Sequence, residues 1–414
     1  MAPSCSCFLG ATLLLSLPRS APAAMWEPLD LHLFVDKVGL AATDGLSLRQ
    51  HRPSKTYEMA VQPDKPWDGG GPMHGAIAGY CSAVQVSATE LRIYYDTFGQ
   101  FGRFLCVAVS QDGGRTWDKP SLGLIEFDGS TANNIVAGKP INSTSMEESI
   151  EPGTVFLDSN PDCPAAEKWK MVITWKGGAT MFASADGFDF KNMTAGPSLT
   201  GSDSQDVVFW DPRAGTGGAY VYYGRSHLRG GQNETCRSSL GPGSVGSVSE
   251  PGRSVNHFTI GTEVAKPWPI DNANTDAEKL TILNTDALDP PCIDLYTNVA
   301  TPLGDAYFFF PMMYNHFDEV YSQGRGNDGL LEARMAVSRD GANVSYISRD
   351  AFLTRGVGQS RVNHTGIYEG AFDAAGNAVA RGFSHVSHFT SKSQSTVYCT
   401  HAVFCWLIAV HQLE

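Results

Sequence analysis

The chain has 414 residues, of which 42% are hydrophobic and only 18% charged, and its net charge is −13. The acidic balance and the lack of a basic run argue against nucleic acid or an anionic membrane as a partner and are compatible with a neutral substrate such as a sugar. The 43 glycines and 23 prolines, without long stretches of helical periodicity, indicate an all-β protein with many short strands.

The first 24 residues have the pattern of a secretory signal peptide. Residues 8–17 form an apolar core and residues 21–24 resemble a small-residue cleavage site, although no Lys or Arg precedes the core. Five Asn-x-Ser/Thr sequons agree with secretion and glycosylation: Asn142, Asn192, Asn233, Asn343 and Asn363. We therefore expect a signal peptide over 1–24 and a secreted mature protein, with a disordered start as the alternative.

A short polar turn occurs three times, each time after an apolar run. Its pattern is Ser-x-Asp-Gly followed by an aromatic residue, at Ser110–Gly113, Ser184–Gly187 and Ser338–Gly341. The Asp can cap backbone N–H groups of the turn and the Gly can adopt a positive φ. The aspartates Asp112, Asp186 and Asp340 are 74 and 154 residues apart, which predicts a repeating unit of about 75 residues with one degenerate copy.

The apolar runs predict three strands in each of four units, after an isolated first strand at 31–35. The expected strands are 76–86, 90–95 and 104–109, then 153–157, 168–175 and 180–183, then 207–210, 219–223 and 254–260, then 293–299, 306–310 and 331–337. A fifth unit begins at 364–369 and reaches 381–383. Three strands that end in a polar turn, with room for a fourth strand, are the make-up of a β-propeller blade. We predict a five-bladed β-propeller over 25–383 with an incomplete fifth blade, which the N-terminal strand could complete.

Three other regions carry little functional signal. Residues 227–253 are Gly/Ser/Pro-rich and predict a surface loop; the GxGxxG at 241–246 within them has no flanking strand and helix, so dinucleotide binding is not expected. Residues 384–414 form an atypical tail whose apolar run, 402–410, is too short to span a bilayer. Seven cysteines follow the signal peptide without a CxxC pair, and Cys81 and Cys106 could form a disulfide or be two small buried residues.

Several motifs together resemble a family of secreted proteins similar to glycoside hydrolase families 32 and 43, the five-bladed propellers of fructosidases and arabinanases. The motifs, in order, are Leu33–Asp36, Lys65–Asp68, Ser110–Gly113 with Trp117, Leu122–Ser130 followed by Asn133–Val136, Phe209–Arg213 and Ala336–Gly341. The resemblance covers residues 31–383 and implies a glycosidase of the propeller fold. Sialidases carry similar Asp-box turns, but the arginine cluster that binds their substrate is not evident here.

Glycoside hydrolysis needs two carboxylates that face the scissile bond. Acids recur near the start of each predicted unit, where the innermost strands of a propeller line the central pocket: Asp68, then Glu148 and Glu151, then Asp203 and Asp206, then Asp294, then Glu369 and Asp373. Each acid by itself could be a solvated turn residue. We predict Asp68 as general base or nucleophile, Asp203 as the residue that orients substrate, and Asp294 or Glu369 as general acid.

Substrate binding is predicted for Asp206 and for three aromatic residues near the inner strands, Trp67, Tyr296 and Tyr368, each of which could instead be core. Asp112, Asp186 and Asp340 are expected to cap peripheral turns and to take no part in chemistry. His74 and His316 are too few for a metal site, so no metal or cofactor is expected. The predicted protein is a monomeric glycoside hydrolase. A non-catalytic glycan- or protein-binding propeller and a sialidase-like exo-glycosidase are the alternatives.

Overall fold

A computed structural model shows a molecule built from β-strands. It describes residues 33–38, 40, 44–53, 60–61, 64–68, 76–99, 102–140, 150–175, 178–194, 199–200, 206–227, 253–260, 268, 280–290, 293–316, 329–353, 369–372, 378–382 and 388–390. Helical structure in these ranges is limited to the 3-10 turns η1 (Pro66–Asp68) and η3 (Ala165–Glu167), and no helix among them is long and apolar enough to cross a membrane. The all-β prediction is confirmed.

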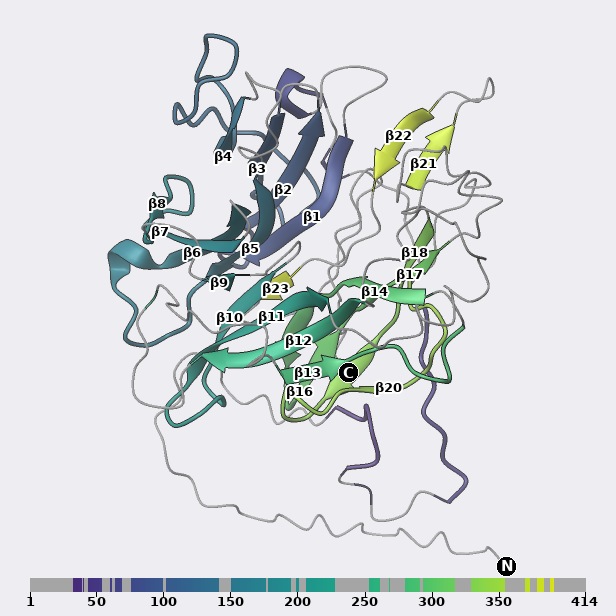
Figure 1. The fold of residues 1–414 in the computed structure, drawn as a ribbon. Helices are drawn as coiled ribbons and strands as arrows, with labels where there is room; N and C mark the ends of the chain where they lie inside the picture. The colour runs from purple at the N-terminus through teal and green to yellow at the C-terminus, as the bar shows by residue number, and fades with distance from the viewer. Residues whose placement is uncertain are drawn as a thin grey trace, which may run out of the picture.

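The first two sheets are antiparallel meanders that follow chain order. The first sheet contains β1 (Ala76–Gln85), β2 (Leu91–Gly99), β3 (Gly102–Ser110) and β4 (Ile135–Pro140). The second contains β5 (Glu151–Leu157), β6 (Trp169–Trp175) and β7 (Gly178–Ser184), with β8 (Lys191–Asn192) and β9 (Leu199–Thr200) both paired to β7. Each sheet has the three strands expected from the sequence and a further outer strand. The two sheets lie at the upper left of Figure 1.

The third sheet repeats this order and lies below the first two in Figure 1. It contains β10 (Val207–Asp211), β11 (Ala219–His227), β12 (Arg253–Ile260) and β13 (Leu280–Leu283). A separate pair, β21 (Glu369–Phe372) and β22 (Ala378–Gly382), lies beside the first sheet. The third sheet includes the three strands predicted for the third unit, and the pair falls in the predicted fifth unit.

The fourth sheet consists of two parts, each hydrogen-bonded within itself, that continue each other along the chain. One part contains β14 (Ile293–Thr297), β17 (Met312–His316) and β18 (Gly329–Ala333), and the other β15 (Ala300–Leu303), β16 (Ala306–Phe309), β19 (Ala336–Ser338) and β20 (Ser345–Tyr346). Pro311 lies between β16 and β17, where one part passes into the other, and it cannot donate a ladder hydrogen bond. Backbone bonds from Phe310 N–H to Val299 (2.8 Å) and from Arg334 N–H to Pro311 (2.9 Å) join the two parts.

Successive sheets pack face to face, because neighbouring residues of a strand point to opposite faces. Tyr94 of β2 packs between the first and second sheets, whereas the adjacent Tyr95 faces the other way. Val208 packs between the second and third sheets, and Val207 between the third and fourth. Strands buried on both faces explain the unbroken apolar runs in the sequence.

The first strands of the first three sheets are also joined by hydroxyl groups. Ser82 Oγ in β1 accepts from the backbone N–H of Val155 in β5 at 3.0 Å. Thr154 Oγ1 in β5 accepts from Val208 N–H in β10 at 3.3 Å and donates to the carbonyl of Asp206 at 2.5 Å. These bonds place β1, β5 and β10 side by side, which is the arrangement that brings residues at the starts of these strands near one another.

The three Ser-x-Asp-Gly turns have one construction. Each follows the third strand of its sheet, β3, β7 or β19, and in each the Asp Oδ1 accepts two backbone N–H bonds. The donors are Arg115 and Thr116 for Asp112, Phe188 and Asp189 for Asp186, and Ala342 and Asn343 for Asp340. The turn glycines Gly113, Gly187 and Gly341 have φ of 75°, 80° and 78°. The predicted capping of these turns by Asp112, Asp186 and Asp340 is confirmed.

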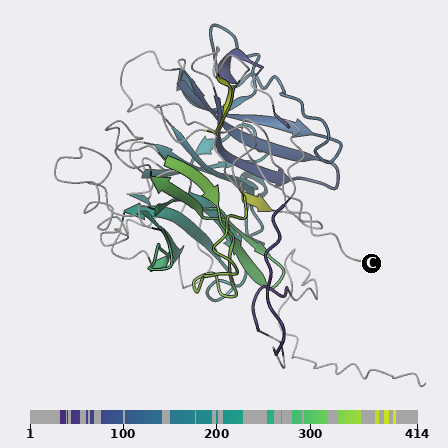
Figure 2. The same cartoon turned by 90° about the vertical axis from the view of Figure 1, so that its right-hand side faces the viewer.

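The predicted N-terminal strand is wrong where the structure describes it. Residues 33–38 are irregular and run along the fourth sheet, as Figure 2 shows. Arg339 binds the Asp36 carboxylate at 2.9 and 3.0 Å and the Leu33 carbonyl at 2.6 Å. Leu33 and Val35 cover the core of that sheet while Phe34 is exposed. Ion pairing with the fourth sheet therefore replaces strand pairing.

The strand that joins β1 comes from the C-terminal region instead. β23 (His388–Thr390) pairs in parallel with β1 at Ser82, Ala83 and Val84. No sheet closes into a ring among the described residues, so the number of five blades stays a prediction. Cys106 is a buried free thiol and Cys81 is disulfide-bonded, so the alternative of a bond between these two is wrong.

Candidate active site

Asp68 lies at the end of η1, in front of the first sheet. Pro66 opens this 3-10 turn, for which its fixed φ is suited, and Asp68 N–H donates to the Lys65 carbonyl at 2.9 Å. A second hydrogen bond joins the same two residues, because Lys65 N–H donates to the Asp68 carboxylate at Oδ2, at 3.1 Å. The turn packs against β2 and leaves Asp68 only 1% exposed. A local turn thus places a charged side chain inside the protein.

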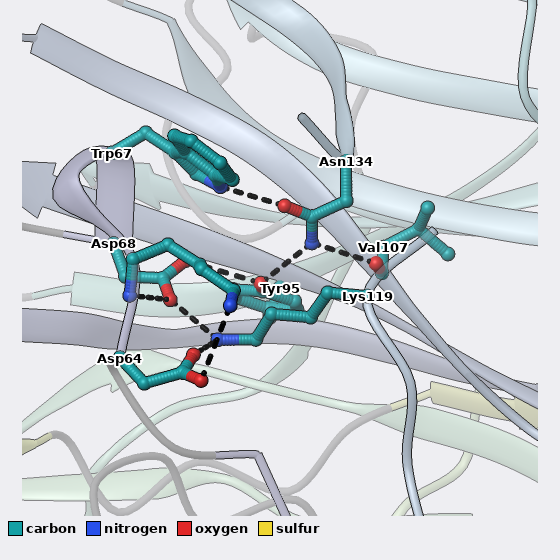
Figure 3. A network of polar contacts seen from close by, with 8 residues as sticks. Asp64, Trp67, Asp68, Tyr95, Val107, Lys119 and Asn134 are labelled. Atoms are coloured by element: carbon teal, nitrogen blue, oxygen red, sulfur yellow. Dashed lines mark hydrogen bonds and ion pairs between the residues drawn. The ribbon is translucent and has the colours of Figure 1, made fainter. Parts of the chain in front are cut away.

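Lys119 supplies the charge that balances Asp68. Its Nζ binds both Asp68 Oδ2 and, at 2.6 Å, Asp64 Oδ1, and it lies 5.6 Å from the centre of the Tyr95 ring. The Lys119 side chain is 10% exposed and that of Asp64 53%. Lys119 therefore bridges a buried and a solvent-facing carboxylate, as Figure 3 shows.

A chain of neutral groups fixes the other side of the carboxylate. Tyr95 OH donates to Asp68 Oδ1 at 3.1 Å and accepts from Asn134 Nδ2 at 2.8 Å. Asn134 also donates to the Val107 carbonyl at 2.8 Å and accepts from Trp67 Nε1 at 2.6 Å. Every polar group in this chain, drawn in Figure 3, has a partner, which is what burial requires.

Burial and ion pairing have opposite effects on Asp68. Burial raises the pKa of Asp68, and although Lys119 and the donors Lys65 N–H and Tyr95 OH oppose this, the pKa stays above the usual value. Burial, with the nearby Cys106 and Asp68, raises the pKa of Tyr95 well above its usual value. The Tyr95 hydroxyl therefore stays protonated and serves as a hydrogen-bond donor to Asp68.

Asp206 occupies a related position directly before β10. It is fully buried, its Oδ1 accepts from Tyr222 OH, and its Oδ2 accepts from Thr174 Oγ1 of the second sheet at 3.2 Å. Tyr95 and Tyr222 both come from the second strand of their sheet and both face an acid in front of the first strand. Asp206 differs from Asp68 in that neutral hydroxyls are the donors to its carboxylate that the structure describes.

The remaining predicted residues are only partly described. Asp294 is the second residue of β14 and Glu369 the first of β21, and only their backbones are described, as is that of His316. Asp203, Tyr368 and His74 lie outside the described residues. Tyr296 is buried in the core of the fourth sheet at 9% exposure, and the Trp67 ring meets Phe127 edge-on at 5.8 Å. The structure therefore joins Asp68 and Trp67 in one network and leaves their catalytic and binding roles as predictions.

Sequence reasoning missed Lys119 and Tyr95 as partners of Asp68, and Asn134 as a partner of Tyr95. The sequence did contain a signal for Tyr95, because two adjacent tyrosines recur in the second strands of the first and third sheets, as Tyr94-Tyr95 and Tyr222-Tyr223. Nothing local marks Lys119, which lies 51 residues from Asp68. Among the described residues, no group of three or more His, Cys, Asp or Glu side chains could hold a metal ion.

Comparison with solved structures finds glycoside hydrolases. One structure, described only as a glycoside hydrolase, has a TM-score of 0.45 at 10% identity, over 79% of this chain and 90% of that one. A thermostable family-43 glycoside hydrolase gives 0.42 at 12%, over 74% and 82%. A putative glycosidase from Bacteroides thetaiotaomicron gives 0.43 at 12%, over 84% and 95%. These similarities are too distant to transfer an activity or a site residue.

No protein-family model matches the sequence, and no curated protein is significantly similar to it. Function has to be argued from the residues of this chain.

Proposed function

We propose that the protein is a secreted glycoside hydrolase that cleaves glycosidic bonds of oligo- or polysaccharides with paired carboxylates. The observation that carries this proposal is the recurrence of acids within a few residues of where the first strand of a sheet begins. Glu151 opens β5, Asp206 directly precedes β10, Asp294 is second in β14, and Glu369 opens β21. Because first strands lie side by side, as β1, β5 and β10 do, acids at their starts approach a common region.

The reaction divides between two carboxyl groups. One carboxyl group protonates the leaving oxygen. The other activates water when the two carboxyl groups are about 6.5–9.5 Å apart, or attacks the anomeric carbon when they are about 5–5.5 Å apart. Asp294 or Glu369 is the proposed acid and Asp68 the proposed base or nucleophile, with Asp203 orienting the substrate. Asp68 would have to part from Lys119 or become exposed to act, since its carboxylate is buried and fully bonded.

The burial of the Asp68 carboxylate favours a second candidate function, a non-catalytic propeller that binds glycans. Asp68 and Asp206 are both closed to solvent and bonded to tyrosines, as structural acids are. In this alternative the two residues stabilise the starts of the first and third sheets, and the carbohydrate is bound without being cleaved. The two functions share a carbohydrate partner and differ in turnover.

A hydrolysis screen separates them. Purified protein is incubated with aryl-glycosides and with plant and algal polysaccharides, and released sugars are quantified. We expect hydrolysis that Asp294→Asn or Asp203→Asn reduces by about 10²–10⁴-fold, whereas Asp350→Asn, which alters an exposed turn carboxylate of the fourth sheet, keeps full activity. Binding of a glycan without turnover supports the second function. Turnover unaffected by either substitution contradicts the assignment of these acids.

A further inference from the structure

Asn298 is a buried amide whose hydrogen-bonding atoms are unused. It lies between β14 and β15 in the first strand of the fourth sheet and is 5% exposed. Neither its Oδ1 nor its Nδ2 has a hydrogen-bond partner. Among the described residues, Thr180 and Gln50 each leave a single buried oxygen unpartnered, so Asn298 is the side chain with the larger deficit. Buried polar groups are normally satisfied, because an unmade hydrogen bond costs the full desolvation of the group.

The register of the sheets shows that Asn298 and Asp206 hold the same position. In the first sheet, Ser82 lies opposite Tyr94, and Tyr94 opposite Val107, three residues before the turn serine Ser110. In the fourth sheet, the residue three before Ser338 lies opposite Phe310, which is bonded to Val299. Val299 therefore corresponds to Ser82, and Asn298 to the preceding Cys81.

The third sheet is aligned by its tyrosine. Tyr94 OH donates to the turn carbonyl of Gly187 in the next sheet at 2.8 Å, and Tyr223 OH donates likewise to Gly341 at 3.0 Å. Tyr223 lies opposite Val207, so Val207 corresponds to Ser82 and Asp206 to Cys81. Asp206 and Asn298 are thus equivalent residues of neighbouring first strands, the first with its carboxylate bonded and the second with its amide unbonded.

We propose that Asn298 binds a hydroxyl group of the carbohydrate substrate; this rests on the proposed carbohydrate function. A sugar hydroxyl is donor and acceptor together, so neighbouring hydroxyls can accept from Nδ2 and donate to Oδ1. A neutral amide suits a neutral sugar better than an anionic one. Asp294, the predicted acid, lies four residues earlier on the same strand, about 13 Å away if extended. Asn298 therefore contacts a part of the glycan away from the scissile bond.

Direct binding measurements test this without requiring turnover. The methyl glycosides of L-arabinose, D-fructose and D-galactose, together with N-acetylneuraminic acid, are titrated into the purified protein by calorimetry. We expect binding of a neutral glycoside that Asn298→Ala weakens about tenfold or more, as the loss of two hydrogen bonds implies. Asn298→Leu is expected to abolish binding while keeping or raising the melting temperature, because an unsatisfied buried amide is removed.

Thr180→Val is the matched control. It removes another buried unpartnered oxygen, from β7, the third strand of the second sheet. We expect it to leave glycoside affinity unchanged. The proposal is overturned if the protein binds none of the four sugars, or if Asn298→Ala and Thr180→Val bind as the wild type does, which identifies an internal water as the only partner of Asn298. Lost binding in Asn298→Ala without any hydrolysis supports the inference and contradicts catalysis. Hydrolysis by the protein together with unchanged glycoside binding in Asn298→Ala supports catalysis and contradicts the inference on Asn298.

Discussion

Asp68 and Asp206 show that two buried carboxylates, each bonded to a tyrosine, can be stabilised in different ways. Each accepts a hydrogen bond from a tyrosine of the second strand, Tyr95 or Tyr222. Asp68 has in addition a lysine, whose side chain is itself 10% exposed. An ion pair withdrawn from water repays its desolvation only while both partners are present. The two acids should therefore differ in what their partners contribute.

Lys119→Met should destabilise the protein by about 3–5 kcal/mol at neutral pH, because it leaves the Asp68 charge buried and uncompensated. The pKa of Asp68 is already raised by burial and rises further without the lysine. A raised carboxyl pKa gives stability at low pH that is lost as pH rises through the folded-state value. The deficit of the variant, measured by urea unfolding, should therefore be smaller in acid than at neutral pH.

Two variants control this experiment. Asp68→Asn combined with Lys119→Met should recover most of the loss, since no buried charge remains. Lys191→Met removes the exposed pair with Asp189, 2.7 Å long, and should cost about 0–1 kcal/mol. A Lys119→Met deficit no larger than that of Lys191→Met, or one independent of pH, contradicts the buried pair.

The strand-and-turn unit is the repeating element of this chain. A third strand ends in a turn whose serine hydroxyl bonds the aspartate at 2.8–2.9 Å and whose glycine has a positive φ. Backbone donors converge on each aspartate. At Asp340, burial by itself raises the pKa, but the N–H groups of Asn343 and Ala342 outweigh it and the pKa is lowered. The turn is therefore stabilised by the ionised carboxylate.

Acid should weaken the turns. A lowered carboxyl pKa gives stability that is present above the unfolded value, about 3.9, and lost as pH falls through the folded one. We expect Asp340→Asn to lower the melting temperature at neutral pH and to converge with the wild type as pH falls well below 4. Asp350→Asn, in an exposed turn, should run parallel to the wild type throughout. A gap between Asp340→Asn and wild type that stays constant with pH counts against the ionised cap.

Contacts between sheets hold the assembly in order. Four sheets stack through shared apolar cores, and tyrosine hydroxyls link the first sheet to the second and the third to the fourth through turn carbonyls. At Gly187 a Cβ would meet the Trp169 ring at 2.6 Å, so the turn fits directly against the sheet. The same device at two interfaces indicates that one packing geometry is repeated.

Tyr94→Phe and Tyr223→Phe should each destabilise the protein by about 1–3 kcal/mol, because each leaves a turn carbonyl without its donor. The two tyrosines share no partner, so the double variant should show the sum within a few tenths of a kcal/mol. Tyr346→Phe is the control with a smaller effect, because this hydroxyl contacts the side chains of Met313, at 4.0 Å, and Arg334 and bonds no turn carbonyl among the described residues. Chemical unfolding gives the free energy of unfolding of the three single variants and the double variant. Equal losses in the three single variants contradict the role of Tyr94 and Tyr223 at the sheet interfaces.

The sequence by itself determined the strands, their order and the turns, since apolar runs and Ser-x-Asp-Gly chemistry act within a few residues. Tertiary structure decided what depends on distant partners. The run at 33–35 has strand composition, yet Asp36 pairs with Arg339, 303 residues away, and holds the segment outside a sheet. The sequence marks Asp68 as a candidate acid but does not mark its lysine and tyrosine partners, because 51 and 27 residues of chain separate them from it. Asn298 was overlooked because an unsatisfied amide can be recognised only once its surroundings are packed. Local propensity specifies elements, whereas charge pairing and burial arise only when the sheets assemble.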